Sequence, residues 1–452
     1  MSREDATRRD TPALHAKTGT WPDGLVISLL LIGALAVRLI PLGFGIESTD
    51  ILLYRQQAIP VVQMKNVYAV TRNVFPYTPV SMFYPALCLN LSGTFGIPFH
   101  IVIKLFAIFS DVGIVLALYS LGVKLFPRRT AICCASLYAL SPVSILVSSF
   151  HGNVMPLVVL LMLTAYLLFR VDADANLTAS GLLLGLAVGW RSFPILLLPF
   201  FLASIDGHAK KIRFAACVVV PVALCMAPFA WVDGTSMVHE VLTYSGWGIH
   251  HGPFGIVRGL HLLSIGSITW INPPEWTPWL TASKFVFLAL YGIAVVFAKR
   301  MGLLNGILVT FFLFDVVYAG VASQYLIWAV PFLLLTEQKA MFWHYQLAAA
   351  YALVVFYWIF FPDILFGTLG LPRVGGAPLL RHYVVSQSLF SAVCTVGIVL
   401  FGKGVAVPVR ASAGPVEVVR LERRRLGVLG QLVCLHYLLV FVWEIVFVLG
   451  LT

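Results

Sequence analysis

The chain has 452 residues, 60% of them hydrophobic and only 11% charged, and its mean hydropathy is +0.93. A water-soluble core cannot hide so much apolar surface, so this composition predicts an integral membrane protein. The apolar runs have helical lengths and lack the ten-residue alternation of membrane strands, which disfavours a β-barrel. The net charge of +11 comes from Lys and Arg residues in short loops between apolar runs, a pattern typical of membrane orientation rather than nucleic-acid binding.

Two further features of the chain limit its class. Residues 1–23 are polar and do not have the organisation of a cleavable signal peptide, so the first apolar segment is expected to remain in the protein. The seven cysteines lie in or beside apolar segments without any CxxC pair. The sequence therefore predicts neither a disulfide framework nor a thiolate metal site.

The apolar segments predict an all-α membrane bundle of about 13 spans or half-spans. They cover residues 24–44, 100–122, 130–149, 154–170, 177–190, 194–205, 212–231, 283–298, 302–320, 325–336, 343–361, 383–401 and 427–449. Residues 81–97 are also apolar, but prolines and glycines interrupt them, so we expect a re-entrant or surface helix there. The predicted parts are a cytoplasmic tail (1–23), a main transmembrane module (24–336) and variable C-terminal helices (337–452).

The basic residues orient this predicted bundle. With the N-terminus in the cytoplasm, most of the 30 Lys and Arg residues fall in inner loops, as the positive-inside rule requires. Two large loops, 45–99 and 232–282, and a smaller one at 362–382 then lie outside. The motif Asp172-Ala-Asp174 resembles a metal-binding DxD, but it falls in an inner hairpin, so we set it aside.

An acidic pair opens the first outer loop, just after the first span. A carboxylate at the mouth of a helical bundle is well placed to take a proton from a substrate that enters from the outer side, which makes Asp50 the first candidate for chemistry. Two simpler interpretations stay open. Asp50 could cap a helix that begins at Ile51, and Glu47 could merely flank that cap.

Basic and polar residues also gather outside, and a cationic group above a carboxylate suits an anionic lipid headgroup such as a phosphate. His151 and Asn153 could instead be turn residues that cap the span from Val154. Arg191 lies between two half-length helices and could instead extend to the membrane surface. Inside the bundle, Lys104 and Asp111 lie two helical turns apart on one face and are expected to form an ion pair.

In their order along the chain, several motifs resemble the GT-C superfamily of membrane glycosyltransferases, which use polyprenyl-phosphate sugars. The bacterial mannosyltransferase branch looks nearest. The resemblance spans roughly residues 24–336 and rests on these motifs: Glu47-Ser-Thr-Asp50, Asn66-Val-Tyr68, the aromatic and proline segment 75–85, Lys104 with Asp111, His151-Gly152-Asn153, Trp190-Arg191-Ser-Phe-Pro194, Tyr244-Ser-Gly-Trp247 and Ser323-Gln324-Tyr325. Many relatives carry an acidic residue in the Gly152-Asn153 turn, and many have Lys where this chain has Arg191.

The resemblance implies a GT-C-type bundle whose extracytoplasmic loops form the active site of an inverting transferase. The sugar, most often mannose in this superfamily, would pass from a polyprenyl phosphate to a hydroxyl of a lipid-linked or glycolipid acceptor. Asp50 is then the catalytic base, and no metal or other cofactor is expected. The donor phosphate is expected at Arg191, Arg258 and His151. The sugar and acceptor pocket is expected at Glu47, Tyr54, Tyr77, Trp247, Gln324 and Tyr325.

The expected setting is a multi-pass protein of a bacterial inner or plasma membrane, with membrane lipids around it and no nucleic-acid partner. Two other functions stay open. A transporter or flippase of lipid-linked sugars would need polar residues along a path through the bundle, whereas these predicted spans carry almost no charge. An oligosaccharide ligase would also act outside, but with polyprenyl-diphosphate donors.

Overall fold

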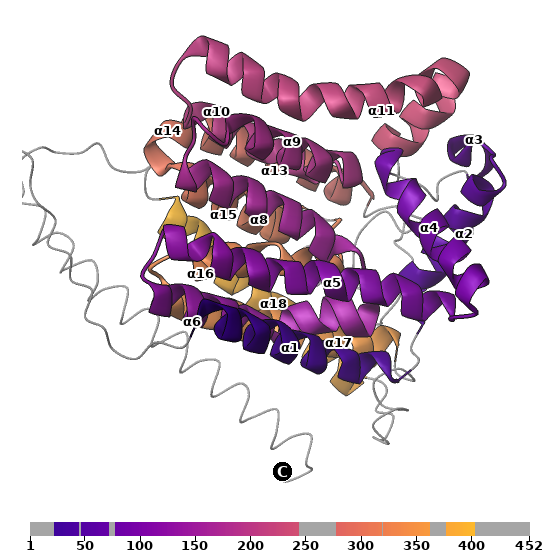
Figure 1. Cartoon of the computed structure of the whole chain (residues 1–452), viewed down its shortest axis with the longest axis horizontal. Coiled ribbons are helices and arrows are strands. Elements are labelled where there is room, and N and C mark those ends of the chain that lie inside the picture. The colour runs from indigo at the N-terminus through magenta and orange to yellow at the C-terminus, as the bar shows by residue number, and fades with distance from the viewer. Residues whose placement is uncertain are drawn as a thin grey trace, which may run out of the picture.

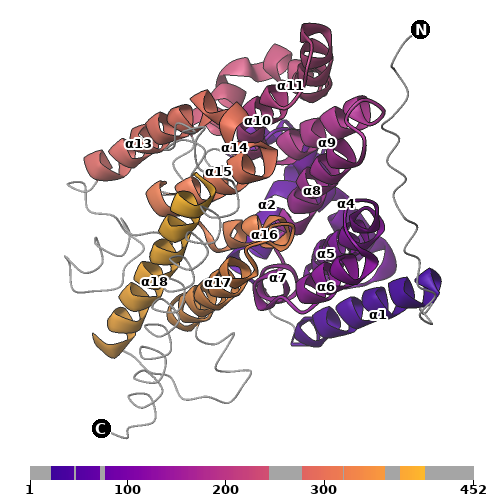
Figure 2. The same ribbon diagram turned by 90° about the vertical axis from the view of Figure 1, so that its left-hand side faces the viewer.

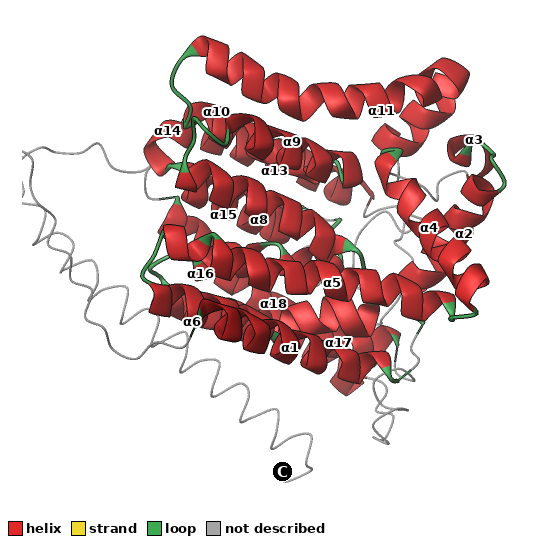
Figure 3. Cartoon of the chain, in the orientation of Figure 1, coloured by secondary structure: helices red, strands yellow, loops and turns green. Residues whose placement is uncertain are grey.

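The structure is a computed structural model. It describes residues 22–44, 47–71, 77–243, 277–318, 320–361 and 377–402. Every regular element in these residues is a helix, as the sequence predicts (Figure 3). The predicted span 427–449 lies outside them, as do most of the predicted outer loop 232–282 and residues 362–376 of the smaller loop.

The helices of the bundle follow the predicted segments closely. In chain order they are α1 (Asp23–Leu42), α5 (Phe99–Ser120), α6 (Arg128–Ala139), α7 (Pro142–Ile145), the π-helix η2 (Leu146–His151), α8 (Met155–Val171), α9 (Leu177–Trp190), the 3-10 helix η3 (Phe193–Leu197), α10 (Leu198–Ala203), α11 (His208–Thr243), α13 (Thr277–Val296), α14 (Ala298–Met301), α15 (Leu303–Val317), the 3-10 helix η5 (Ser323–Ile327), α16 (Ala329–Leu334), α17 (Lys339–Phe360) and α18 (Ala377–Phe401). A short 3-10 turn, η1 (Gly122–Lys124), follows α5.

Four of the described helices are long and apolar enough to cross a membrane: α1, α5, α11 and α18. A fifth span is possible if α6 and the α7–η2 segment count as one, although they are bent by 44°. The bend has a local cause, because Pro142 cannot continue the backbone ladder of α6 and the hydroxyl of Ser141 caps the next helix at Ser144 N. Several other apolar helices are short, so the count of about 13 spans stays a prediction.

Helices far apart in the sequence pack side by side. Figure 2 shows α1, α5 and α6 together on one side of the bundle and α15, α17 and α18 together on another. Aromatic rings fill part of the space between helices: the ring of Phe193 stacks on Trp328 with centroids 4.0 Å apart, and Phe314 meets Phe193 edge to face at 4.8 Å. Such contacts hold the loop after α9 against α15 and η5.

Three helices lie across one end of the bundle: α2 (Thr49–Val62), α3 (Val67–Thr71) and α4 (Val80–Phe95) (Figure 1). They belong to the loop predicted to lie outside. α4 has 16 residues and does not qualify as a span, in agreement with the surface or re-entrant helix expected at 81–97. A tyrosine fixes it in place, because the Tyr84 hydroxyl donates to the Ile103 carbonyl of α5 at 2.8 Å.

Candidate active site

The acidic loop enters α2 through Ser48. This residue, rather than Asp50, is the N-cap: its hydroxyl oxygen accepts from Ile51 N and its hydroxyl donates to the His151 carbonyl at 2.6 Å. The expectation that Asp50 caps the helix is therefore wrong. Asp50 lies in the first turn of α2, where its side chain is free for other contacts, and the Ser48 bond brings that turn against residue 151.

Asp50 is held by the turn after η2. One carboxylate oxygen, Oδ2, lies 2.8 Å from His151 Nε2 and accepts from Asn153 Nδ2 at 2.6 Å. Among the described residues the other oxygen, Oδ1, makes no hydrogen bond, and the side chain is 23% exposed. Asp50 therefore presents one fixed oxygen to the protein and one open oxygen to a ligand.

Asn153 and His151 do more than form a turn. Asn153 Oδ1 does accept from Met155 N at 2.9 Å, as the capping interpretation expects, but its amide also binds Asp50. His151, which the sequence predicts at the donor phosphate, contacts Asp50 through Nε2, while its buried Nδ1 has no hydrogen-bond partner in the described part of the chain. The sequence alone does not mark Asn153 as a site residue, because an asparagine ahead of a helix is typical of a cap.

The charge on Asp50 is favoured by these contacts. Burial raises the pKa of the Asp50 carboxyl, but His151, Asn153 and the more distant Arg191 together outweigh it and hold the pKa below its ordinary value. Because the carboxylate is then ionised, it accepts both bonds, so His151 Nε2 must carry the shared proton. Asp50 is a negatively charged acceptor at neutral pH.

Arg191 faces the same site from the end of α9. The backbone leaves the helix at this residue in an extended conformation, ahead of Pro194, which cannot donate to the helical ladder. The side chain is 6% exposed, and its guanidinium lies 3.4 Å from the centroid of the Tyr77 ring. It also reaches the Tyr54 hydroxyl at 3.4 Å. The interpretation that Arg191 extends to the membrane surface is therefore wrong.

The positive charge of Arg191 has no carboxylate partner in the described residues. Among the described residues no carboxylate lies within salt-bridge distance of its guanidinium, and Asp50 acts on it only through the longer-range field. The Tyr77 ring provides a cation–π contact but no negative charge. A buried guanidinium without a counter-ion is costly, and a bound anion removes that cost.

The structure brings some of the predicted pocket residues together. Tyr54, Tyr77 and Tyr325 all interact with Arg191, and burial raises the pKa of Tyr77, which keeps its hydroxyl neutral. Gln324 accepts from Ser323 at 3.3 Å and is not hydrogen-bonded to Asp50. Glu47 lies apart from Asp50 and binds His100 at 2.9 Å. Trp247 and Arg258 lie outside the described residues.

One tyrosine from α17 also lies beside the site, although the sequence does not predict it there. The Tyr357 ring lies 5.8 Å from the His151 ring between centroids. Its hydroxyl is buried and has no hydrogen-bond partner among the described residues. No motif in the sequence marks this residue, because a single tyrosine in an apolar helix is indistinguishable from core packing.

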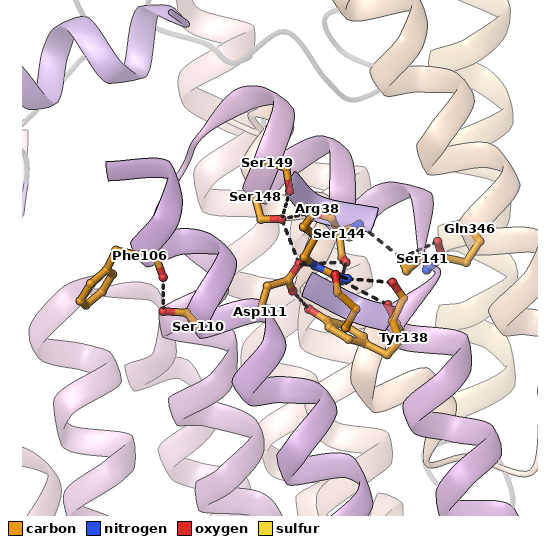
Figure 4. Close-up of polar contacts among 12 residues, drawn as sticks. Arg38, Phe106, Ser110, Asp111, Tyr138, Ser141, Ser144, Ser148, Ser149 and Gln346 are labelled. Atoms are coloured by element: carbon orange, nitrogen blue, oxygen red, sulfur yellow. Dashed lines mark hydrogen bonds and ion pairs between the residues drawn. The ribbon is translucent and has the colours of Figure 1, made fainter. Parts of the chain in front are cut away.

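A buried ion pair supports the turn that carries His151 (Figure 4). Arg38 Nε lies 2.6 Å from Asp111 Oδ2, and the same carboxylate accepts from Ser144 and Ser148, at 3.0 and 2.9 Å. Tyr138 donates to its other oxygen. The expected pair of Lys104 with Asp111 is thus not formed, because Arg38 from α1 takes the carboxylate. Since both serines precede the His151 turn, the network holds η2 in the widened helical form common at functional sites.

This network predicts a large loss of stability on Asp111→Asn. Removing one partner of a buried ion pair leaves the other charge uncompensated, at a cost of about 3–5 kcal/mol. We expect a lower thermal unfolding midpoint in detergent and partial recovery in Arg38→Met/Asp111→Asn, which removes both charges of this pair. Lys210→Gln, which removes an exposed pair with Asp174, is the control and should leave the midpoint nearly unchanged. Equal midpoints for wild type and Asp111→Asn would refute the structural role.

The contacts on Asp50 predict a pH effect. If ionised Asp50 is the active form, activity falls on the acid side as it becomes protonated, and its lowered pKa puts that fall below about pH 4. His151→Gln removes the imidazole that contacts Asp50 Oδ2 and helps to hold the Asp50 pKa low, so the acid limb of kcat/KM should move to higher pH. Asn153→Ala should move it in the same direction. An unchanged limb in both variants would show that another group controls it.

Comparison with known proteins adds one relative. No family model matches the chain. GPI mannosyltransferase 1 of Candida albicans is 25% identical to it over 313 residues, which cover 63% of this chain and 73% of the fungal protein. This weak similarity supports the GT-C superfamily and a membrane glycosyltransferase. The assignment to the bacterial branch and to a bacterial membrane stays a prediction, since this relative is fungal.

Described residues offer no cluster of three or more His, Cys, Asp or Glu side chains that could hold a metal ion. The independence from metals and cofactors that the sequence predicts is a matter for experiment.

Proposed function

We propose that this protein is an inverting mannosyltransferase that moves mannose from a polyprenyl phosphate to a hydroxyl of a glycolipid or other lipid-linked acceptor. The observation that carries the proposal is the pairing of Asp50, with one open oxygen, and Arg191, a buried cation without a carboxylate partner. A base beside an anion site is what transfer from a sugar phosphate needs. The mannosyltransferase similarity supports the choice of sugar.

The reaction uses the two groups in one displacement. The acceptor oxygen attacks the anomeric carbon while its proton passes to Asp50 Oδ1, and the bond from that carbon to the phosphate oxygen breaks. The phosphate leaves with the electron pair, and Arg191 stabilises the added negative charge. A single displacement inverts the anomeric centre, and phosphate is a good enough leaving group that no second carboxylate acid is required.

The lowered pKa of Asp50 describes the site before the donor binds. A phosphate on Arg191 cancels part of the positive field that favours the ionised carboxylate and adds a negative charge nearby. Both effects raise the pKa of Asp50 and make it a stronger base. Donor binding therefore prepares the carboxylate for the proton that it must accept.

In this proposal the active site faces the extracytoplasmic side. The positive-inside rule supports this face, because most Lys and Arg residues then lie in cytoplasmic loops and α2, α4 and the His151 turn lie outside.

The main alternative function is transport of a lipid-linked sugar along a path through the bundle. Asp111 and Arg38 satisfy one another within the bundle, and the buried carboxylate of Asp315 lies 3.3 Å from the Tyr345 hydroxyl. These contacts are typical of side chains that stabilise the bundle, rather than of a polar path along which a sugar headgroup passes.

The test is transfer of labelled mannose, then glucose and arabinose, from synthetic polyprenyl-phosphate donors to membrane glycolipids by the purified full chain. We expect transfer of mannose, inversion at the anomeric carbon, and no loss of activity in EDTA. Loss of activity in EDTA would refute metal independence. Transfer only from diphosphate oligosaccharide donors would favour a ligase, and no transfer from any donor would favour a flippase.

A further inference from the structure

A second charged group lies beside the start of α2, formed by Glu47, His100 and Lys104. Glu47 Oε1 lies 2.9 Å from His100 Nδ1. His100 and Lys104 are one turn apart in α5, so their side chains lie on the same face. The group joins the acidic loop to the outer end of α5.

Lys104 is the unusual member of this group. Its side chain is fully buried, and its Nζ has no hydrogen-bond partner among the described residues. Glu47 is the charged group that acts on it, but the hydrogen bond of Glu47 goes to His100. A buried ammonium that donates no hydrogen bond is costly, and such a group favours a bound anion.

Lys104 lies against the catalytic turn. Gly152 has φ +78°, and a Cβ at this position would lie 2.8 Å from both Ile51 Cδ1 and Lys104 Cγ, and 3.1 Å from Lys104 Cε. Only glycine allows this approach, because the left-handed conformation and the contacts both exclude a side chain. The lysine stem therefore touches the backbone between the two residues that bind Asp50.

The Lys104 ammonium is nevertheless separate from the donor site. Asp50 Oδ2 is bound by His151 and Asn153, whereas Lys104 Nζ makes no hydrogen bond to any described residue. Asp50 and Tyr54 are one helical turn apart, and Tyr54 reaches Arg191, whereas Ile51 lies about 100° further round α2 and, like Lys104, lies against Gly152. Two cationic sites thus flank the first turn of α2.

We propose that Lys104 and His100 bind the phosphate of the acceptor lipid, and that Glu47 occupies this site until the acceptor arrives. This inference rests on the proposed function and names its acceptor class: a glycolipid whose sugar is linked to the lipid through a phosphodiester. The acceptor phosphate would take the place of the Glu47 carboxylate on His100 and would accept the hydrogen bond that Lys104 Nζ lacks. Its sugar hydroxyl would then lie toward Asp50 Oδ1, with the donor phosphate on Arg191.

The test uses two acceptors with the same sugar, one joined to diacylglycerol by a phosphodiester and one by a neutral glycosidic bond. We expect Lys104→Met to raise the KM of the phosphodiester acceptor about 10- to 100-fold, the range for a lost hydrogen bond to a charged group. The KM of the neutral acceptor and of the donor should not change. Lys104→Arg, which keeps the charge, should lose less than Lys104→Met.

Glu47→Gln should change the KM of the phosphodiester acceptor in the opposite direction. Removing the competing carboxylate should lower the KM of the phosphodiester acceptor about two- to fivefold, as for an exposed ion pair. This variant keeps the proposal testable even if Lys104→Met does not fold. A higher KM in Glu47→Gln would overturn the proposal.

Two other results would overturn it. If Lys104→Met raised the KM of both acceptors equally, Lys104 would have only a structural role. If it raised the KM of the donor, Lys104 would bind the donor phosphate rather than the acceptor phosphate. If the wild type transfers no sugar, the proposed function fails on its own, and binding of fluorescent forms of the two acceptors is measured instead. Tighter binding of the phosphodiester form by wild type than by Lys104→Met would support the anion site, and equal binding would refute it.

Discussion

Asp50→Asn is expected to lower kcat by about 10²–10⁴-fold, the usual contribution of a positioned general base. The amide has nearly the shape of the carboxylate and retains an oxygen that can accept from Asn153 or His151, so the turn should stay in place. It cannot take a proton from the acceptor, because a neutral amide is a very weak base. The measurement is single-turnover transfer from a saturating polyprenyl-phosphate mannose donor.

Asp174→Asn is the control for this variant. It removes a carboxylate too, but an exposed one that binds Lys210 rather than the His151 turn. Its kcat should stay within about twofold of the wild type, as expected for an exposed ion pair away from the reacting atoms. Full activity in Asp50→Asn, with the same unfolding midpoint as wild type, would move the base to another residue.

Arg191→Gln should have the second largest effect, a fall in kcat of about 10²–10³-fold, the range for loss of one group that stabilises developing charge. The KM of the donor should rise as well, because the guanidinium also binds the phosphate in the ground state. Arg191→Lys should retain part of the activity, since it keeps the charge but loses the flat stacking on Tyr77.

Arg213→Gln is the control for Arg191→Gln. Arg213 is an exposed arginine that donates to Thr178 and lies in α11, away from the site. It should leave both kinetic constants unchanged. If Arg191→Gln alters only the KM of the acceptor, the assignment of Arg191 to the donor phosphate is wrong, and the two cationic sites must be exchanged.

Both cationic sites depend on what surrounds the first turn of α2. Arg191 approaches from α9 and contacts Tyr54 and Tyr77, and the stem of Lys104 in α5 lies against Gly152. Asp50, the proposed base, lies in that first turn. A donor and an acceptor that both carry phosphate would repel one another in water, and separate cations on two faces of one helix turn offset that repulsion.

Composition and hydropathy alone determine that this is a helical membrane protein, because no soluble fold can cover so apolar a chain. The order of motifs also determined the choice of Asp50, Arg191 and Tyr77 as members of one site. Such residues can be found without a structure because a charged or hydrogen-bonding group stands out in an apolar sequence.

The partners of these groups were decided only by the tertiary structure. Helical spacing predicts an ion pair between Lys104 and Asp111. In the structure the Asp111 carboxylate instead pairs with Arg38, 73 positions away in another helix. The contacts of Asn153 with Asp50 and of Tyr357 with His151 also join distant segments. Local spacing determines which face of a helix a side chain lies on, but the charge that it meets there depends on which other helix packs against that face.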